Sequence, residues 1–291
     1  MKNPEPITLC APGKINLLLR ITARRQDGFH ELVSLFHAVP RVADTITMTA
    51  VEPEGLRMCC NVPDIPVDSG NLVVKAVELF CERMGIAPAW QIGLLKNIPA
   101  AAGMGGGSSD AGTVLRFLNR RYPGMSKEDL ISLADEIGSD VPFFLEPGDA
   151  VVRGTGEILE NLELLPPIPL LAVFPAFPVR AAWAYRHLQK MTPAEQAEHE
   201  IAELIKAWRQ CDWEKTAALC ANDLETALFA KFPLLNDLKK QLTGNGALCV
   251  HVSGSGPVLF AVFSDRKKLE YAAACCRNAV NTDAGIRVME C

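Results

Sequence analysis

A run of small residues from 99 to 110 is the part of the sequence best suited to hold an anion. It reads Pro-Ala-Ala-Ala-Gly-Met-Gly-Gly-Gly-Ser-Ser-Asp and lies between an apolar stretch and a helical pattern. Four glycines let the main chain approach a ligand closely, and N–H groups at a helix start can converge on phosphate oxygens. Ser108, Ser109 and Asp110 can cap the following helix, and the two hydroxyls could also reach a phosphate or its magnesium ion. The alternative is a flexible turn, although ordering four glycines for a turn alone is costly.

The loop does not match the common nucleotide-binding fingerprints. A dinucleotide motif that contains Gly103 and Gly105 requires a glycine at position 108, which is a serine. The Walker sequence requires Gly-Lys followed by serine or threonine, whereas Gly13-Lys14 is followed by isoleucine. The sequence therefore disfavours both a Rossmann oxidoreductase and a P-loop NTPase.

Two further segments place polar groups among apolar residues. Lys14 and Asn16 are two positions apart and so share one face of a predicted strand. A lysine there needs an anionic partner, unless it lies at a strand edge and extends into water. Asp140 comes directly before a predicted apolar strand over residues 141–145, where removal from water would matter. The alternative for Asp140 is an ordinary turn after a helix end.

The surrounding patterns predict an α+β chain of two domains, with residues 1–160 and 161–291 separated near a proline cluster at 161–169. Helical spacing begins after Asn71 and ends at Gly85, and Ser126 is a predicted helix cap. The other predicted helices follow the glycine loop up to residue 122 and cover 126–137, much of 193–241, and 265–280. The predicted strands are 15–22, 32–39, 44–51, 90–98, 141–145, 150–159, 170–174, and two apolar runs that flank residues 253–257.

Composition narrows the class of protein. The chain has 291 residues, 34 acidic against 29 basic side chains and a net charge of −5, which gives no reason to expect a nucleic-acid or membrane-surface partner. The first six residues lack a secretory pattern and no apolar run is long enough for a membrane helix, so we expect a cytoplasmic protein. The 10 cysteines show no C-x-x-C spacing, which favours reduced, mostly buried thiols over a zinc site.

Three segments, taken in order, resemble the signature motifs of the GHMP (galactose, homoserine, mevalonate, phosphomevalonate) small-molecule kinases. They are Pro-Gly-Lys-Ile-Asn at 12–16, the run at 99–110, and Ser-Gly-Ser-Gly-Pro at 253–257. Residues 27–32, Phe36 and residues 138–143 are similar to the branch that acts on a cytidine diphosphate-linked methylerythritol. The resemblance is densest before residue 160. It implies a two-domain GHMP kinase fold, with an N-terminal ribosomal protein S5 domain 2-like, ATP-binding domain and a C-terminal ferredoxin-like α/β domain on the substrate side.

The resemblance also implies a reaction. It is the transfer of the γ-phosphoryl group of ATP, carried with Mg²⁺, to the 2-hydroxyl of the small-molecule substrate, in the non-mevalonate route to isoprenoid precursors. Asp140 is then the general base and Lys14 its electrostatic partner, in a monomer or weak homodimer. The implied ATP-binding residues are Asn71, Lys96, Pro99, Gly103, Gly105, Gly106, Gly107, Ser108 and Ser109, with Mg²⁺ near Ser109. The implied substrate-binding residues are Asn16, Phe29, His30, Tyr185, Gly254 and Ser255.

Some positions depart from the family pattern, and other functions stay open. Phe29 stands where the family usually has tyrosine, which keeps ring stacking but removes a hydroxyl, and Gly112 replaces an alanine at a cost in helix propensity of up to about 1 kcal/mol. One alternative is another GHMP kinase, for homoserine, mevalonate or a sugar, which would not need Phe29 and His30. Another is a non-catalytic nucleotide- or RNA-binding module, against which the acidic net charge argues.

Overall fold

The computed structural model describes residues 5–163, 165–279 and 287–291. By compactness the chain divides into two units that are not consecutive in sequence. Unit 1 comprises Met1–Gly13, Ala43–Pro99 and Gly105–Pro147, and unit 2 comprises Lys14–Val42, Ala100–Met104 and Gly148–Cys291. The first two strands, β1 (Ile7–Arg24) and β2 (His30–Ala50), each contribute to both units. The domain boundary near residue 160 stays a prediction.

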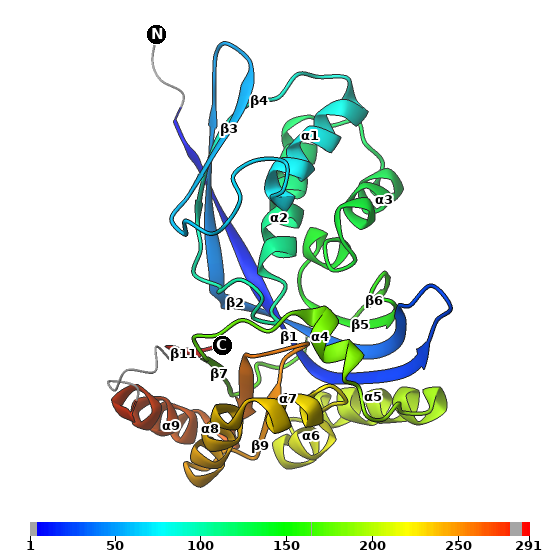
Figure 1. The fold of residues 1–291 in the computed structure, drawn as a ribbon, viewed down its shortest axis with the longest axis vertical. Coiled ribbons are helices and arrows are strands. Elements are labelled where there is room, and N and C mark those ends of the chain that lie inside the picture. Colours follow the sequence, from blue (N-terminus) through cyan, green and yellow to red (C-terminus); the bar gives the residue numbers. More distant parts are fainter. Residues whose placement is uncertain (1–4, 164, 280–286) are drawn as a thin grey trace. The chain divides into compact units, whose positions relative to one another are not determined.

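Unit 1 is a set of strands covered by helices (Figure 1). Strand β3 (Gly55–Cys60) is parallel to β4 (Ala89–Leu95), and β4 is antiparallel to the end of β2. Helices α1 (Leu72–Met84), α2 (Gly106–Arg121) and α3 (Lys127–Ile137) pack against one another. As predicted, α1 begins after Asn71 and ends at Gly85, whose φ is 64°. The structure adds that the Asn71 side chain caps the helix by accepting from the Val73 N–H. A short 3₁₀ helix, η1 (Pro142–Leu145), follows α3.

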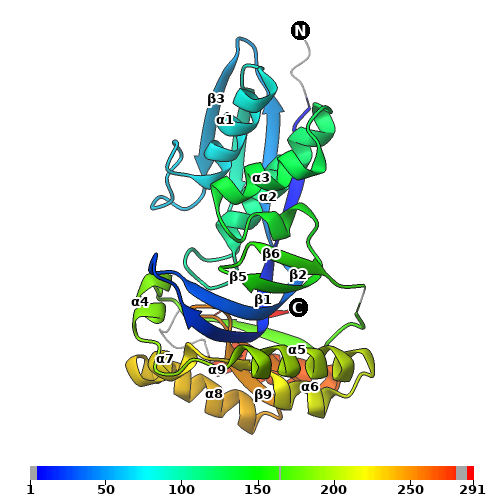
Figure 2. The ribbon, with the colours of Figure 1, turned by 90° about the vertical axis from the view of Figure 1, so that its right-hand side faces the viewer.

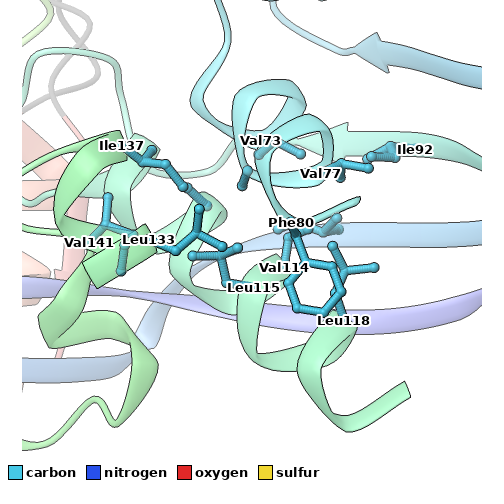
Figure 3. Packing of buried hydrophobic residues seen from close by; sticks show 14 of the residues in the cluster. Val73, Val77, Phe80, Ile92, Val114, Leu115, Leu118, Leu133, Ile137 and Val141 are labelled. Carbon is cyan, nitrogen blue, oxygen red and sulfur yellow. The ribbon is translucent and has the colours of Figure 1, made fainter. Parts of the chain in front are cut away.

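The hydrophobic core of unit 1 lies between helices α1, α2 and α3 and the strands that they cover (Figure 3). Val73, Val77 and Phe80 lie on one face of α1 at helical spacing and are fully buried. Burial of each such side chain contributes roughly 1.5–3 kcal/mol. The same cluster includes Val114, Leu115 and Leu118 of α2, Leu133 and Ile137 of α3, Ile92 of β4, and Val141. Because α2 begins at the glycine loop, this packing fixes the C-terminal side of that loop.

Unit 2 contains a second sheet, with helices packed on it (Figure 2). Strands β7 (Leu170–Phe174), β9 (Cys249–Val252), β10 (Leu259–Val262) and β11 (Arg287–Glu290) form an antiparallel sheet in the order β11-β7-β10-β9. The start of β2 pairs with β5 (Asp149–Gly154), which pairs with β6 (Ile158–Asn161), and β8 (Ala221–Asn222) is parallel to β1. The helices are α4 (Ala181–Arg186), α5 (Ala194–Arg209), α6 (Trp213–Leu219), α7 (Glu225–Lys231), α8 (Pro233–Gly244) and α9 (Arg266–Ala279).

Several predicted elements differ from the structure. The strand predicted over 141–145 is the 3₁₀ helix η1, because Pro142 at its first position favours a helical φ. The strand predicted over 150–159 is the hairpin of β5 and β6, since Gly154 and Gly156 turn the chain at φ values of 69° and 126°. The runs at 32–39 and 44–51 are a single strand, β2. All ten cysteines are free, in agreement with the prediction of reduced thiols, but the prediction that most are buried is wrong: the buried ones are Cys81, Cys220 and Cys276.

Parts of three predictions fall outside the described residues. They are the absence of a leader at residues 1–4, residue 164 of the predicted linker, and residue 280 at the end of the last predicted helix. Within the ranges that the structure describes, no helix is both long and apolar enough to cross a membrane.

Candidate active site

The glycine loop passes through left-handed backbone conformations before α2 begins. The φ angle is 82° at Gly103 and 66° at Gly105, a region that glycine enters far more readily than residues with a Cβ. Helix α2 begins at Gly106 without a side-chain hydrogen bond at its cap, so the prediction that Ser108, Ser109 or Asp110 caps it is wrong. The N–H groups of its first turn, at the positive end of the helix dipole, suit an anionic ligand.

Residues from all three sequence motifs meet within unit 2. The Ser253 hydroxyl donates to the Gly103 carbonyl at 3.1 Å and accepts from the Asn16 N–H at 3.2 Å. A Cβ on Gly254 would lie 3.1 Å from the Gly103 carbonyl oxygen and 3.2 Å from the Asn16 Oδ1, so this backbone approach requires glycine. The Asn222 side chain donates to the Val252 and Gly254 carbonyls, each at 2.7 Å. Asn16, Gly103 and Ser253, one residue from each motif, therefore lie together in unit 2.

Lys14 and Asn16 are buried and joined to each other. The Lys14 ammonium donates to the Asn16 Oδ1 at 2.7 Å and lies 4.3 Å from the centre of the Phe36 ring. The Asn16 Nδ2 donates to the Ser34 hydroxyl at 2.9 Å, which donates to the Leu18 carbonyl at 2.6 Å. Sequence reasoning missed Ser34, although its alternation with Phe36 along β2 places both on one face. These contacts fix the position of the Lys14 charge.

Lys96 lies in a buried charge cluster with Asp44 and Asp110, in unit 1. Its ammonium pairs with the Asp44 Oδ2 and, at 2.7 Å, with the Asp110 Oδ2. The side chains are 6%, 0% and 2% exposed, respectively. The pKa of Lys96 lies above its ordinary value because Asp110 and Asp44 act on it more strongly than burial opposes them. The ammonium also lies 3.2 Å from the position of a Cβ on Gly106, at the start of α2.

The two carboxylates of this cluster differ in how fully they are bonded. The Asp44 Oδ1 accepts from the N–H groups of Asn97 and Ile98 at 2.6 and 2.8 Å. The Asp110 Oδ1 is buried and has no hydrogen-bond partner. Burial raises the pKa of Asp110 to about 7, with Lys96 opposing the rise and Asp44 adding to it. The sequence analysis did not identify Asp110 as a member of a buried charge cluster, and it did not single out Asp44.

Asp140 lies half-buried between the end of α3 and η1. The turn is closed by the Val141 N–H, which donates to the Gly138 carbonyl at 2.9 Å. Helix α2 comes so close to η1 that a Cβ on Gly112 would lie 2.7 Å from the Phe144 Cβ. Gly112 thus holds the Asp140 segment against the helix that starts at the glycine loop. Asp140 belongs to unit 1 and Lys14 to unit 2, and their pairing stays a prediction.

The predicted base-binding residues lie together in unit 2. The rings of His30 and Tyr185 are 5.3 Å apart and tilted by 31°. Phe29 is 65% exposed, unusual for a phenylalanine that has no ligand to contact. Burial, and then the charge of Arg24, lower the pKa of His30, which favours the neutral imidazole. A neutral ring can both donate and accept a hydrogen bond at the edge of a base.

The other predicted nucleotide-binding residues divide into two groups. Asn71 and Ser109 are engaged in the fold: the Asn71 Nδ2 donates to the Pro66 carbonyl at 2.7 Å, and the Ser109 Oγ donates to the Pro12 carbonyl at 2.6 Å. The second group is at least partly accessible and consists of Pro99, Gly107 and Ser108. Ser255 of the third motif, which was predicted to bind the substrate, is also partly accessible.

The buried Ser109 does not fit the expected magnesium site. Its hydroxyl is fully buried and already donates to a main-chain carbonyl. Among the described residues, no group of three or more His, Cys, Asp or Glu side chains is placed to hold a metal ion. Mg²⁺ in kinases is commonly held by one or two carboxylates together with the substrate phosphates and water, so a complete protein cage is not required.

Comparisons with known proteins agree with this geometry. The model of the GHMP kinases N terminal domain matches residues 71–148, and that of the GHMP kinases C terminal domain matches residues 204–281. The 4-diphosphocytidyl-2-C-methyl-D-erythritol kinase of Pelobacter propionicus is 35% identical over 271 residues, covering 93% of this chain and 94% of that one. The Chlorobium phaeobacteroides kinase of the same name is 38% identical over 272 residues, covering 92% and 93%.

A solved structure extends the similarity to the whole fold. A crystal structure of 4-(cytidine 5'-diphospho)-2C-methyl-D-erythritol kinase matches with a TM-score of 0.82 and 33% identity, covering 98% of each chain. The predicted α+β, two-domain GHMP kinase fold is therefore confirmed. The chain belongs to the 4-diphosphocytidyl-2-C-methyl-D-erythritol kinase family of the GHMP kinases.

Proposed function

We propose that this protein transfers the γ-phosphoryl group of ATP to the 2-hydroxyl of 4-diphosphocytidyl-2-C-methyl-D-erythritol. The observation that carries the proposal is the meeting of Asn16, Gly103 and Ser253, one residue from each kinase motif, through hydrogen bonds of 3.1 and 3.2 Å. Relatives that match over more than nine-tenths of the chain carry the name of this activity. The reaction places the protein in the synthesis of isoprenoid precursors by the non-mevalonate route.

The residues have distinct parts in the proposed reaction. The main chain from Gly103 to Ser108 binds the polyphosphate, helped by the positive end of α2. Asp140 accepts the proton of the 2-hydroxyl as that oxygen attacks the γ-phosphorus, and the bond from phosphorus to the β–γ bridging oxygen breaks to release ADP. Lys14, held by Asn16 and Phe36, stabilises the charge on the transferred group. Positioning and charge stabilisation account for most of phosphoryl-transfer catalysis, so no covalent intermediate is needed.

The cytidine end of the substrate, which does not react, binds to aromatic residues. His30 and Tyr185, with rings 5.3 Å apart, and the exposed Phe29 bind the cytosine, by stacking and by hydrogen bonds to its edge. Asn16, Gly254 and Ser255 lie nearer the reacting hydroxyl and the diphosphate. The working location is the cytoplasm, and the protein acts as a monomer or weak homodimer.

A turnover assay tests the function and the base together. The protein is incubated with ATP, Mg²⁺ and the cytidyl alcohol, and the 2-phosphate product is followed by ³¹P NMR. Asp140→Asn is expected to lower turnover by about 10²–10⁴-fold with little change in ATP affinity. The control is Asp135→Asn, the same change at an exposed carboxylate on α3. Near-normal turnover of Asp140→Asn would remove this residue from the role of base.

The same assay separates the alternatives. A homoserine, mevalonate or sugar kinase would phosphorylate one of those acceptors faster than the cytidyl alcohol. A non-catalytic RNA-binding module would produce no phosphorylated product and would show RNA affinity that falls steeply with salt in a filter-binding assay.

A further inference from the structure

The cluster of Asp44, Lys96 and Asp110 has an imbalance of charge. With both carboxylates ionised, it holds two negative charges and one positive charge at side chains that are at most 6% exposed. An uncompensated charge away from water is costly. A proton on one of the carboxylates removes the imbalance, and the hydrogen bonds show which one can take it.

Asp110 is the member that can accept a proton without losing a bond. Both Asp44 oxygens already accept hydrogen bonds, the Oδ1 from two main-chain N–H groups and the Oδ2 from Lys96. A proton on Asp44 would displace one of these donors. The Asp110 Oδ2 accepts from Lys96 at 2.7 Å, whereas its buried Oδ1 has no partner. A proton on that atom leaves the ion pair with Lys96 intact.

Thr113 does not stabilise the ionised Asp110. It lies three residues after Asp110, on the same face of α2. Its hydroxyl oxygen is also buried without a hydrogen-bond partner. The two oxygens are not bonded to each other, so the ionised form of Asp110 gains no hydrogen bond from this hydroxyl.

The cluster lies next to the first residue of α2, where the phosphates are proposed to bind. The Lys96 ammonium is 3.2 Å from the position of a Cβ on Gly106, the first residue of α2. Negative charge brought to this helix end disfavours the ionised form of a nearby carboxylate. We propose that Asp110 takes up a proton when a nucleoside polyphosphate binds at the start of α2, so that the cluster becomes neutral while Lys96 keeps both carboxylate partners. The inference rests on the proposed function in placing the polyphosphate there.

Other charged groups around α2 are directed elsewhere. Lys96 and Asp44 are the charged groups that act on the Asp110 carboxyl, and its pKa of about 7 places the exchange near neutral pH. On the packed helices, Lys75 and Arg83 of α1 donate to Glu136 of α3. The remaining ones on α1 and α3 are exposed: Glu78, Glu82, Lys127, Glu128, Asp129 and Asp135. Helix α2 itself carries Arg116, Arg120 and Arg121, at least six residues after Asp110.

Calorimetry tests the proton uptake. Binding of Mg-ADP to the full chain is measured at pH 7.5 in HEPES and in Tris, whose ionisation enthalpies differ, and the difference in binding enthalpy gives the protons exchanged. The wild type is expected to take up more protons than Asp110→Asn, by up to about one per nucleotide. Protons exchanged by the nucleotide itself cancel in this difference. Asp135→Asn, an exposed carboxylate on α3, is expected to match the wild type.

The outcomes separate the inference from the proposed function. If wild type and Asp110→Asn bind the nucleotide with equal proton uptake, the inference is wrong and the proposed function stands. If the wild type binds no nucleotide, both are overturned. If Asp110→Asn does not fold, proton uptake by the wild type alone is measured from pH 6 to pH 9. Uptake is expected to be largest above pH 7, and no net uptake at any pH would overturn the inference.

Discussion

The carbonyl oxygen of Ser253 lies 2.2 Å from the position that a Cβ atom on Gly103 would occupy. Two chain segments 150 residues apart are thus in direct main-chain contact, and the Ser253 hydroxyl donates to the Gly103 carbonyl across the same contact. A side chain at position 103 would push the second motif away from the third. The glycine is therefore needed for the assembly of the site as well as for the bend of the loop.

Replacement of Gly103 should destabilise unit 2. Gly103→Ala places a Cβ against main-chain atoms and forces alanine to a φ of 82°. We expect the free energy of unfolding in urea to fall by at least about 2 kcal/mol. Gly148→Ala is the matched control, since a Cβ there meets nothing within 4 Å. Equal unfolding free energies for the two variants would show that the loop accommodates a Cβ at position 103 without loss of stability.

Gly112 should tolerate alanine poorly, despite lying within a helix. Alanine improves helix propensity by up to about 1 kcal/mol, but its Cβ would lie 2.7 Å from the Phe144 Cβ and 3.0 Å from the Val141 carbonyl. Overpacking of this kind costs about 1–3 kcal/mol, so Gly112→Ala should have a lower unfolding free energy than the wild type. Gly107→Ala is the control, because its Cβ meets only Leu72 at 3.7 Å. A Gly112→Ala protein as stable as this control would contradict the packing argument.

Sequence patterns predicted correctly those features that are set by residues close together in the chain, such as helix ends. Asn71 and Gly85 mark the ends of α1 correctly because a cap acts within a few residues of its own position. The glycine run before α2 was recognisable as a loop at a helix start for the same reason. The apolar segment after Asp140 was mistaken for a strand, since a short buried run has no periodicity that separates strand from 3₁₀ helix.

Contacts between distant segments could not be predicted in this way. Asp44 lies 52 residues before Lys96 and shows no feature that distinguishes it from any aspartate at a strand. Asp110 looked like a helix cap, and only its burial beside Lys96 shows that it belongs to a charge cluster. The resemblance to a kinase family identified the site residues by motif, whereas the groups that hold Lys14 and Lys96 in place become visible only in three dimensions.

The stability of the protein should depend on pH through Asp110. Its pKa is raised to about 7 in the folded state, so folding favours the protonated form relative to the unfolded chain. The contribution of Asp110 to stability is thus largest below the unfolded pKa near 4 and is lost as the pH rises to 7, at roughly 1.4 kcal/mol per pH unit at most. In urea unfolding at pH 5.5 and 8, Asp110→Asn should gain stability relative to the wild type at the higher pH. A constant difference at both values would exclude the titration.

Binding of the cytidyl substrate should depend on His30 far more than binding of ATP does. The His30 and Tyr185 rings lie 5.3 Å apart, and loss of one aromatic contact to a base typically costs about 1–3 kcal/mol. In steady-state kinetics, His30→Ala should therefore raise the KM for the cytidyl alcohol by about 10–100-fold, with a much smaller change in the KM for ATP. His187→Ala is the control, an exposed histidine that stacks on Trp183 at 4.4 Å, and should leave both values near those of the wild type. Equal losses for the two substrates in His30→Ala would show that His30 supports the fold and does not bind the base.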